Sequence, residues 1–134
     1  MFSKETEYAM RSLVYIRKQN ICEKNPGVVE IAREIEAPPF YTGKILQNLV
    51  RRGLLASKKG KGGGFYFPEG KSNLLLKDLI EVTEGNHIFT SCGFGQKSCD
   101  CDNPCPLHEK YSKIRESLNR LVSTETIDTL TRPG

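Results

Sequence analysis

A pair of prolines followed by a cluster of glycines limits the fold of this chain more than any other feature of its sequence. Pro38 and Pro39 end the segment VVEIAREIEA, because the residue before a proline avoids helical geometry and a proline supplies no backbone N–H. The turn GKGGG, at residues 60–64, separates LLASKK from FYFP and predicts a β-hairpin. The chain is therefore expected to combine short helices with one small hairpin.

Apolar residues recur at three- and four-residue spacing on both sides of the hairpin, which indicates amphipathic helices. In the third helix, Ile45, Leu46 and Leu49 belong to the buried stripe, and Gly53 provides the C-terminal cap. The fourth helix is expected to begin with Asn73 as its N-cap. The predicted helices of this part of the chain cover residues 3–20, 28–35, 39–53 and 73–85.

The second and third predicted helices are joined by a tight turn, and the third carries polar side chains on its outer face. This pattern is typical of a helix-turn-helix, although a three-helix bundle with a solvated polar face has the same periodicity. The hairpin that follows favours a winged helix-turn-helix over a simple bundle. Between Thr42 and Lys61 there are six lysines and arginines and no acidic residue, which suits contacts with DNA phosphates. A nucleotide-binding loop is disfavoured, because GKGGG lacks the Lys-Ser/Thr ending of a P-loop.

A narrow apolar stripe near the C-terminus predicts a further helix. Its members recur at alternating steps of four and three residues, as in the a and d positions of a heptad. The stripe could lie against its own subunit, but an intersubunit role is favoured, because dimers are how winged helices read two half-sites. The residues of the stripe are Leu107, Tyr111, Ile114, Leu118 and Leu121.

Four of the five cysteines lie in the segment CGFGQKSCDCDNPC, residues 92–105, and His108 follows closely. Thiolate and imidazole are ligands for zinc and for iron–sulfur clusters. The segment lacks paired Cys-two-residue-Cys knuckles, so zinc and iron–sulfur remain equal alternatives, with a metal-free thiol sensor third. No run of 18 apolar residues and no signal-peptide pattern occurs, which predicts a cytoplasmic protein that is not inserted in a membrane. Structural disulfides are disfavoured in that compartment.

Several stretches of the chain, in the same order, resemble the Rrf-type family of bacterial winged-helix transcriptional regulators, of the IscR, NsrR and CymR kind. The resemblance implies a mainly α fold with a small β-hairpin: a winged helix-turn-helix domain at residues 1–85, a cysteine-rich cluster-binding loop at 86–108, and a dimerisation helix with a C-terminal tail at 109–134. It also implies a homodimer, a double-stranded DNA operator and no enzymatic activity. The stretches are FSKETEYAMRSLVYI, EIAREI, FYTGKILQNLVRRGLLASKKGKGGGF, LKDLIEVTEG and CGFGQKSCDCDNPCPLH.

Candidate DNA contacts follow from the resemblance and from the basic stretch. The third helix of the family reads the major groove, and its wing tip enters the minor groove through an arginine, where this chain has Lys59. That replacement keeps the charge and leaves open how the minor groove is read. The candidate DNA-binding residues are Phe40, Tyr41, Thr42, Lys44, Gln47, Arg51, Lys58, Lys59 and Lys61.

Cluster ligands are also implied by the resemblance. Cluster-binding members use three cysteines, matched here by Cys92, Cys99 and Cys105, while Cys101 is an extra thiol that could replace Cys99. The fourth ligand is His108, as in IscR-like members, or Glu7 of the other subunit, as in NsrR-like members. The predicted function is a regulator that senses redox, nitric oxide or iron–sulfur status through a two-iron or four-iron cluster. A thiol redox switch or zinc site on the same DNA-binding module is the alternative, and a cluster carrier or redox enzyme is less favoured.

Overall fold

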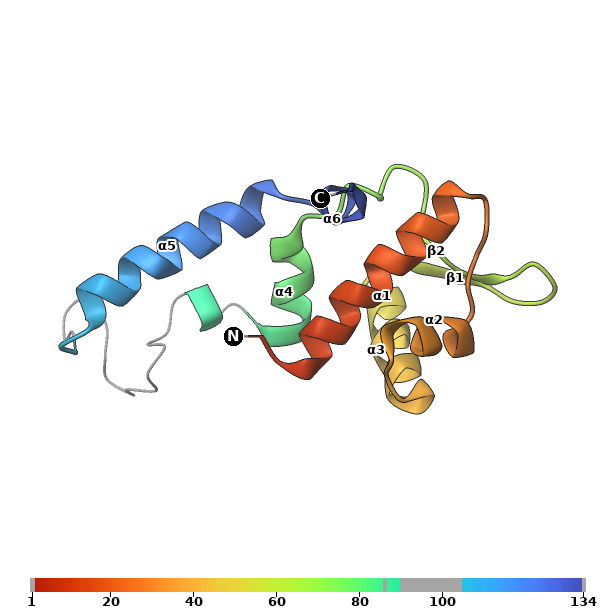
Figure 1. The fold of residues 1–134 in the computed structure, drawn as a ribbon, viewed down its shortest axis with the longest axis horizontal. Helices are drawn as coiled ribbons and strands as arrows, with labels where there is room; N and C mark the ends of the chain where they lie inside the picture. The colour runs from red at the N-terminus through yellow and green to blue at the C-terminus, as the bar shows by residue number, and fades with distance from the viewer. Residues whose placement is uncertain (1, 86, 90–104, 134) are drawn as a thin grey trace.

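A computed structural model describes residues 2–85, 87–89 and 105–133. The described part is mainly helical, with one two-stranded antiparallel hairpin (Figure 1). Within these ranges, no helix is long and apolar enough to span a bilayer. The elements are α1 (Lys4–Ile21), α2 (Val28–Ile35), α3 (Pro39–Arg51), β1 (Ala56–Lys58), β2 (Gly64–Tyr66), α4 (Leu76–Glu84), the 3-10 helix η1 (His87–Phe89), α5 (His108–Thr124) and α6 (Ile127–Thr131).

The first three helices pack around one hydrophobic core. We call α1, α2, α3, the hairpin and α4 together the head. Helix α1 contributes a stripe that is completely buried and contacts the apolar faces of α2, α3 and α4. The predicted stripe of α3 is also buried, so the amphipathic pattern identified the core-facing side of these helices correctly. The head core includes Ala9, Leu13, Ile16, Ile31, Ile35, Ile45, Leu46, Leu49, Leu79 and Ile80.

The turn between α2 and α3 is built as the prolines require. Glu36 ends α2 in a left-handed conformation (φ 57°), and Pro39 takes the first turn of α3, where its missing N–H costs nothing. The Thr42 hydroxyl donates a hydrogen bond to the Pro38 carbonyl at 2.9 Å, and the side chain of Thr42 is fully buried. This contact fixes the start of α3 against the turn.

The hairpin needs a glycine at position 64, because its backbone there packs directly against the backbone of residues 25–26. Ser57 of β1 pairs with Phe65 of β2, and the Phe65 N–H donates to the Pro26 carbonyl at 2.8 Å. The hairpin is therefore joined to the loop between α1 and α2. Gly64 has φ 145°, and a Cβ there would lie 2.1 Å from the Asn25 carbonyl oxygen. A larger residue could not occupy that position without moving one of the two segments.

Helix α4 starts later than the sequence pattern predicts. The expected cap was Asn73, but the helix begins at Leu76 and its N-cap residue, Leu75, makes no side-chain capping bond. The preceding residues instead pair with the C-terminal segment: the Leu76 N–H donates to the Glu125 carbonyl at 3.0 Å, and the Ile127 N–H donates to the Leu74 carbonyl at 2.9 Å. This pairing holds residues 74–75 extended and delays the start of the helix.

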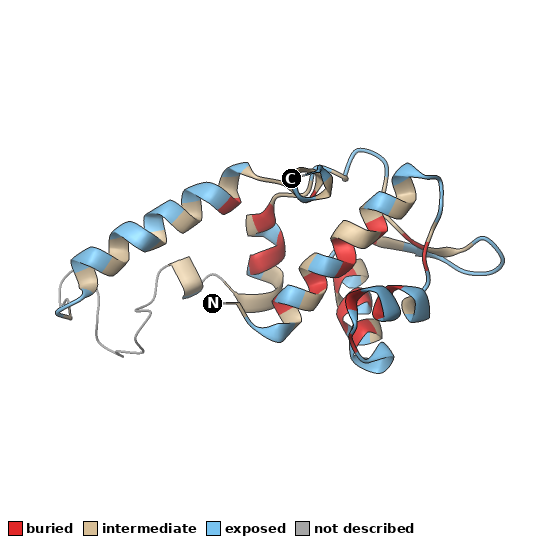
Figure 2. Ribbon diagram, viewed as in Figure 1, coloured by how far each residue is buried: buried red, intermediate tan, exposed pale blue. Residues whose placement is uncertain are grey.

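The two C-terminal helices behave differently. Helix α5 extends away from the head, and of its residues, all of them described, Val122 is the one classed as buried (Figures 1 and 2). Helix α6 was not predicted and packs back against α1, with Ile127 completely buried and Arg17 Nε 2.7 Å from Asp128 Oδ1. This helix lies in the segment that the sequence assigned to the C-terminal tail, and it contacts α1.

Candidate functional site

The outer face of α3 exposes most of the predicted DNA-contacting side chains. Phe40 is 78% exposed and Tyr41 is 38% exposed, and Lys44, Gln47 and Arg51 are exposed as well. Thr42 differs from the prediction, because its side chain is fully buried and its hydroxyl bonds to Pro38. Thr42 therefore supports the helix start and does not reach the outer face.

Two ring contacts order the aromatic side chains of this face. The Lys44 ammonium lies 4.7 Å from the centroid of the Phe40 ring, one helical turn away. The Tyr41 ring meets the Tyr8 ring of α1 edge-on at 5.7 Å, and the Arg11 guanidinium lies 5.9 Å from the Tyr8 centroid. Sequence reasoning did not single out Tyr8 or Arg11, because the contact between Tyr8 and Tyr41 joins two different helices.

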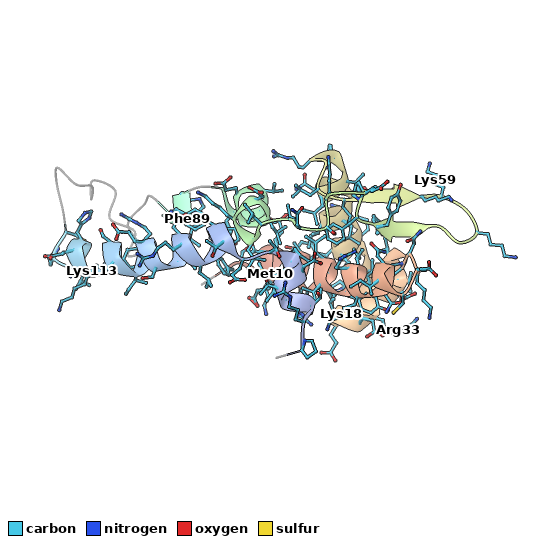
Figure 3. The ribbon with its side chains drawn as sticks, turned by 90° about the horizontal axis from the view of Figure 1, so that it is seen from above. Met10, Lys18, Arg33, Lys59, Phe89 and Lys113 are labelled. Atoms are coloured by element: carbon cyan, nitrogen blue, oxygen red, sulfur yellow. The ribbon has the colours of Figure 1, made fainter. Side chains whose placement is uncertain are left out.

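The hairpin places a second group of cations away from α5. Lys58, Lys59 and Lys61 are exposed, and Lys59 lies at the opposite end of the molecule from Lys113 of α5 (Figure 3). The hairpin and the face of α3 thus offer separate cationic surfaces on one rigid core, as groove contacts from a helix and a wing would require.

Asn20 ties the hairpin to α1 and was missed by sequence reasoning. Its side-chain carbonyl accepts the Phe67 N–H at 2.9 Å, and its amide donates to the Lys24 carbonyl at 2.9 Å and to the Phe65 carbonyl at 3.3 Å. The Asn20 side chain therefore bonds to the loop between α1 and α2, to Phe65 in β2 and to Phe67 just after β2. An asparagine just before the turn KNPG was the available signal, but nothing local identifies its partners in residues 65–67.

The start of α5 brings two of the candidate ligands into one turn. The His108 N–H donates to the Cys105 carbonyl at 3.0 Å, and both residues are partly exposed. Cys92, Cys99 and Cys101 lie outside the described residues. Among the residues that are described, no three His, Cys, Asp or Glu side chains gather as a metal-binding group. The thiol and imidazole of this turn are donors that suit an iron–sulfur cluster or zinc, so the described part of the site fits either group.

A hydrogen-bonded network joins the start of α1 to the end of α4. Thr6 is fully buried, its hydroxyl donates to Glu84 Oε1 at 2.6 Å, and the Ser3 N–H donates to the same oxygen at 2.7 Å. Burial acts to raise the pKa of Glu84, but the hydrogen bonds from Ser3 and Thr6 outweigh it and lower that pKa below its ordinary value. Glu7, the alternative ligand, is exposed in the first turn of the same helix.

The fold and this surface define the class of protein: a winged-helix transcription regulator with a C-terminal helix. The chain belongs to the Rrf2 family, described as iron-dependent transcriptional regulators, whose family model matches residues 2–133. The family and the relatives are transcriptional regulators and not enzymes. The recognition made from the sequence motifs is therefore confirmed, as is the predicted winged-helix fold.

Three known proteins illustrate the likeness. Protein aau3 of Rhizobium meliloti is 31% identical over 97% of this chain and 84% of its own length. The transcriptional repressor NsrR of Streptomyces coelicolor is 25% identical over 78% of this chain and 66% of its own length. The structure of CymR, the global cysteine regulator of Bacillus subtilis, superposes with a TM-score of 0.76 over 98% of this chain and 95% of its own, at 19% identity.

Proposed function

We propose that this chain is a homodimeric transcription regulator of the bacterial cytoplasm that senses redox, nitric oxide or iron–sulfur status through a cluster and binds a pseudo-palindromic operator. The observation that carries the proposal is the arrangement of one rigid head. It exposes a helix face and a basic wing. A long helix, α5, extends from it and begins at His108, whose N–H bonds to the carbonyl of Cys105 in the preceding turn.

The DNA-binding part of the proposal rests on exposed side chains of two elements. In α3, Phe40, Tyr41, Lys44, Gln47 and Arg51 would face the major groove, and their backbone is held in place by a fully buried stripe on the opposite side. In the wing, Lys58, Lys59 and Lys61 would contact phosphates or the minor groove.

The homodimer is supported by apolar residues that helix α5 leaves in solvent. Leu107, Ile114 and Leu121 stand seven residues apart and are 44%, 55% and 56% exposed. A seven-residue repeat of large apolar side chains is the seam that a second helix covers in a coiled coil. We therefore assign residues 109–124 to dimerisation, residues 86–108 to the sensor loop, and residues 125–131 together with 1–85 to the head.

The cluster would be held by Cys92, Cys99 and Cys105, with His108 or the partner subunit's Glu7 as the fourth ligand and Cys101 as a spare thiol. Such a cluster supplies a centre that oxidants or nitric oxide can attack. Within this chain, the turn between Cys105 and His108 leads into α5. Loss of the bond between the cluster and either side chain would therefore free the start of that helix. NsrR, the Streptomyces relative, is named as a transcriptional repressor, which supports a role in transcription regulation.

Anaerobic purification tests the cluster directly. We expect a brown protein with matching amounts of iron and acid-labile sulfide, and loss of the colour in Cys105→Ala with the dimer retained. Cys22→Ala is the matched control, because Cys22 is exposed at the far end of α1 and should leave the colour unchanged. A colourless anaerobic preparation that holds one zinc per chain would contradict the cluster.

A thiol switch on the same module is the second candidate, with a zinc site as its variant. It is favoured by the fourth cysteine of the loop and by the structural likeness to CymR, a cysteine regulator. It predicts a colourless protein in which mild oxidant forms reversible disulfides among Cys99, Cys101 and Cys105, detected by mass spectrometry of alkylated peptides. The affinity for the operator would then change when the disulfide forms and return to its original value when a reductant breaks it.

A further inference from the structure

The most exposed large apolar side chain among the described residues stands on the face of α3 that we assign to DNA. Phe40 is 78% exposed, whereas Ile45 and Leu46 of the same helix are 3% and 0% exposed. A ring this exposed gains little from burial against the head. A ligand that covered the ring would gain the free energy of burying its apolar surface.

The backbone that carries this ring is rigid. Pro39 fixes φ in the first turn of α3, and the buried Thr42 hydroxyl bonds back to the Pro38 carbonyl at 2.9 Å. The Lys44 ammonium at 4.7 Å from the ring centroid limits the ring further and marks its surroundings as suited to an anionic partner. A side chain held in this way loses little freedom when it binds.

The position of Phe40 determines which part of a duplex it would meet. In a helix-turn-helix the N-terminal residues of the second helix contact base edges in the major groove, and Phe40 is the second residue of α3. Phe40, Lys44 and Gln47 lie on one side of the helix at spacings of four and three. Seven residues of helix span about 10 Å, close to three base pairs at about 3.4 Å each. The row thus presents a phenyl, an ammonium and an amide group to consecutive base pairs.

We propose that Phe40 is a specificity-determining residue that reads the C5-methyl group of a thymine in each operator half-site. The inference rests on the DNA-binding function proposed above and adds a base preference to it. A phenyl ring has no hydrogen-bond donor or acceptor, and the one apolar group that base pairs display in the major groove is the thymine methyl. Lys44, held beside the ring, would contact a phosphate or a guanine next to that thymine.

The test removes that methyl group from the DNA and the ring from the protein. The anaerobically purified full-length protein first selects its duplex from a random pool. Each thymine of the selected half-site is then replaced singly by 2′-deoxyuridine, and dissociation constants are measured by fluorescence anisotropy. We expect one position per half-site at which deoxyuridine weakens binding about fourfold, from the transfer free energy of one methyl group. Phe40→Ala should bind thymine and deoxyuridine duplexes equally at that position.

Gln47→Ala is the matched control on the same face. It should weaken binding to the selected duplex but keep the preference for thymine over deoxyuridine. Unchanged circular dichroism and melting of Phe40→Ala would show that the head is intact, as its exposure predicts.

Three results would overturn the inference, and they differ from failure of the proposed function. The wild type could bind its selected duplex with no position sensitive to deoxyuridine, or Phe40→Ala could keep that sensitivity. Operator affinity could also be unchanged in Phe40→Ala, which would mean that the ring faces a protein partner instead. If no duplex is enriched from the pool at all, the proposed DNA-binding function is wrong, and the proposed base preference is wrong with it.

Discussion

Replacing Asn20 by alanine tests whether one side chain holds the wing in place. The substitution removes the acceptor of the Phe67 N–H and the donor to the Lys24 carbonyl, both at 2.9 Å. Each such hydrogen bond contributes about 1 kcal/mol to stability, so Asn20→Ala should lower the free energy of unfolding by about 2 kcal/mol. For a chain of this size that corresponds to a fall in melting temperature of about 8 °C.

The location of the effect distinguishes this reasoning from a general loss of stability. Hydrogen exchange followed by mass spectrometry should show faster exchange in peptides that cover residues 64–68, because the amide of Phe67 loses its partner. Operator affinity should fall at the same time, and its dependence on salt should become shallower, since a displaced wing makes fewer phosphate contacts. The lysines of the wing are themselves unchanged in this variant.

A control next to Asn20 and a double-mutant cycle complete the test. Gln19 contributes backbone carbonyl contacts to the same turn, and these survive in Gln19→Ala, which should therefore melt close to the wild type. If Asn20 acts through the wing, Lys59→Ala should cost less affinity in the Asn20→Ala background than in the wild type. Additive effects on affinity, or unchanged exchange at residues 64–68, would refute the wing role.

Five further substitutions test other parts of the structure by urea unfolding. Gly64→Ala should lower the free energy of unfolding by about 2 kcal/mol or more, since its positive φ and the backbone 2.1 Å from the new Cβ both oppose a side chain. Gly43→Ala, where the Cβ has ordinary clearance inside α3, should instead stabilise by up to about 1 kcal/mol. Ile127→Ala should cost about 3 kcal/mol because that side chain is completely buried, whereas Leu130→Ala, at 43% exposed, should cost well under half of that. Glu84→Gln should cost stability at neutral pH and less at acid pH: the folded-state pKa of Glu84 lies below the ordinary value of 4.5, so its stabilisation is present above pH 4.5 and disappears as pH falls through the lowered pKa. A gap between wild type and Glu84→Gln that stays constant from pH 7 to about pH 3 would contradict that assignment.

The helices of the head could be predicted because their signals are local. Periodic apolar residues, Pro38 and Pro39 at the turn, and the glycines of residues 60–64 each act within a few positions of the chain. The structure places α1, α2, α3 and the hairpin within one or two residues of the predicted bounds. The exposed outer face of α3 was also foreseen, because the polar residues of an amphipathic helix lie opposite its apolar stripe.

The remaining features depend on contacts between distant segments, which periodicity does not encode. Asn73 looked like a cap, but residues 74–75 are held extended by backbone pairing of residues 74–76 with residues 125–127. Helix α6 is too short to show a periodic signal, and it is stabilised by the burial of Ile127 against α1. Thr42 was named as a DNA-contact candidate from the family resemblance, but its side chain is buried and its hydroxyl donates to the Pro38 carbonyl. Each departure from the sequence pattern is the result of one long-range or backbone contact.

The two ends of α5 are held in different ways, and this bears on how a signal could reach the head. At its C-terminal end, the Leu76 N–H bonds to the Glu125 carbonyl, which joins the end of the helix to α4. Helix α6 follows directly and is joined to α1 by the pair of Arg17 and Asp128. At its start, the helix follows the turn of Cys105 and His108, in the proposed sensor loop. Along its length it leaves large apolar side chains in solvent. If that loop is the sensor, a helix fixed at its far end would transmit displacement as rotation about that end. Since α6 bonds to the same α1 that carries Tyr8 against Tyr41 and Asn20 against the hairpin, a change at the cysteines would act on both proposed DNA-contacting elements through α1.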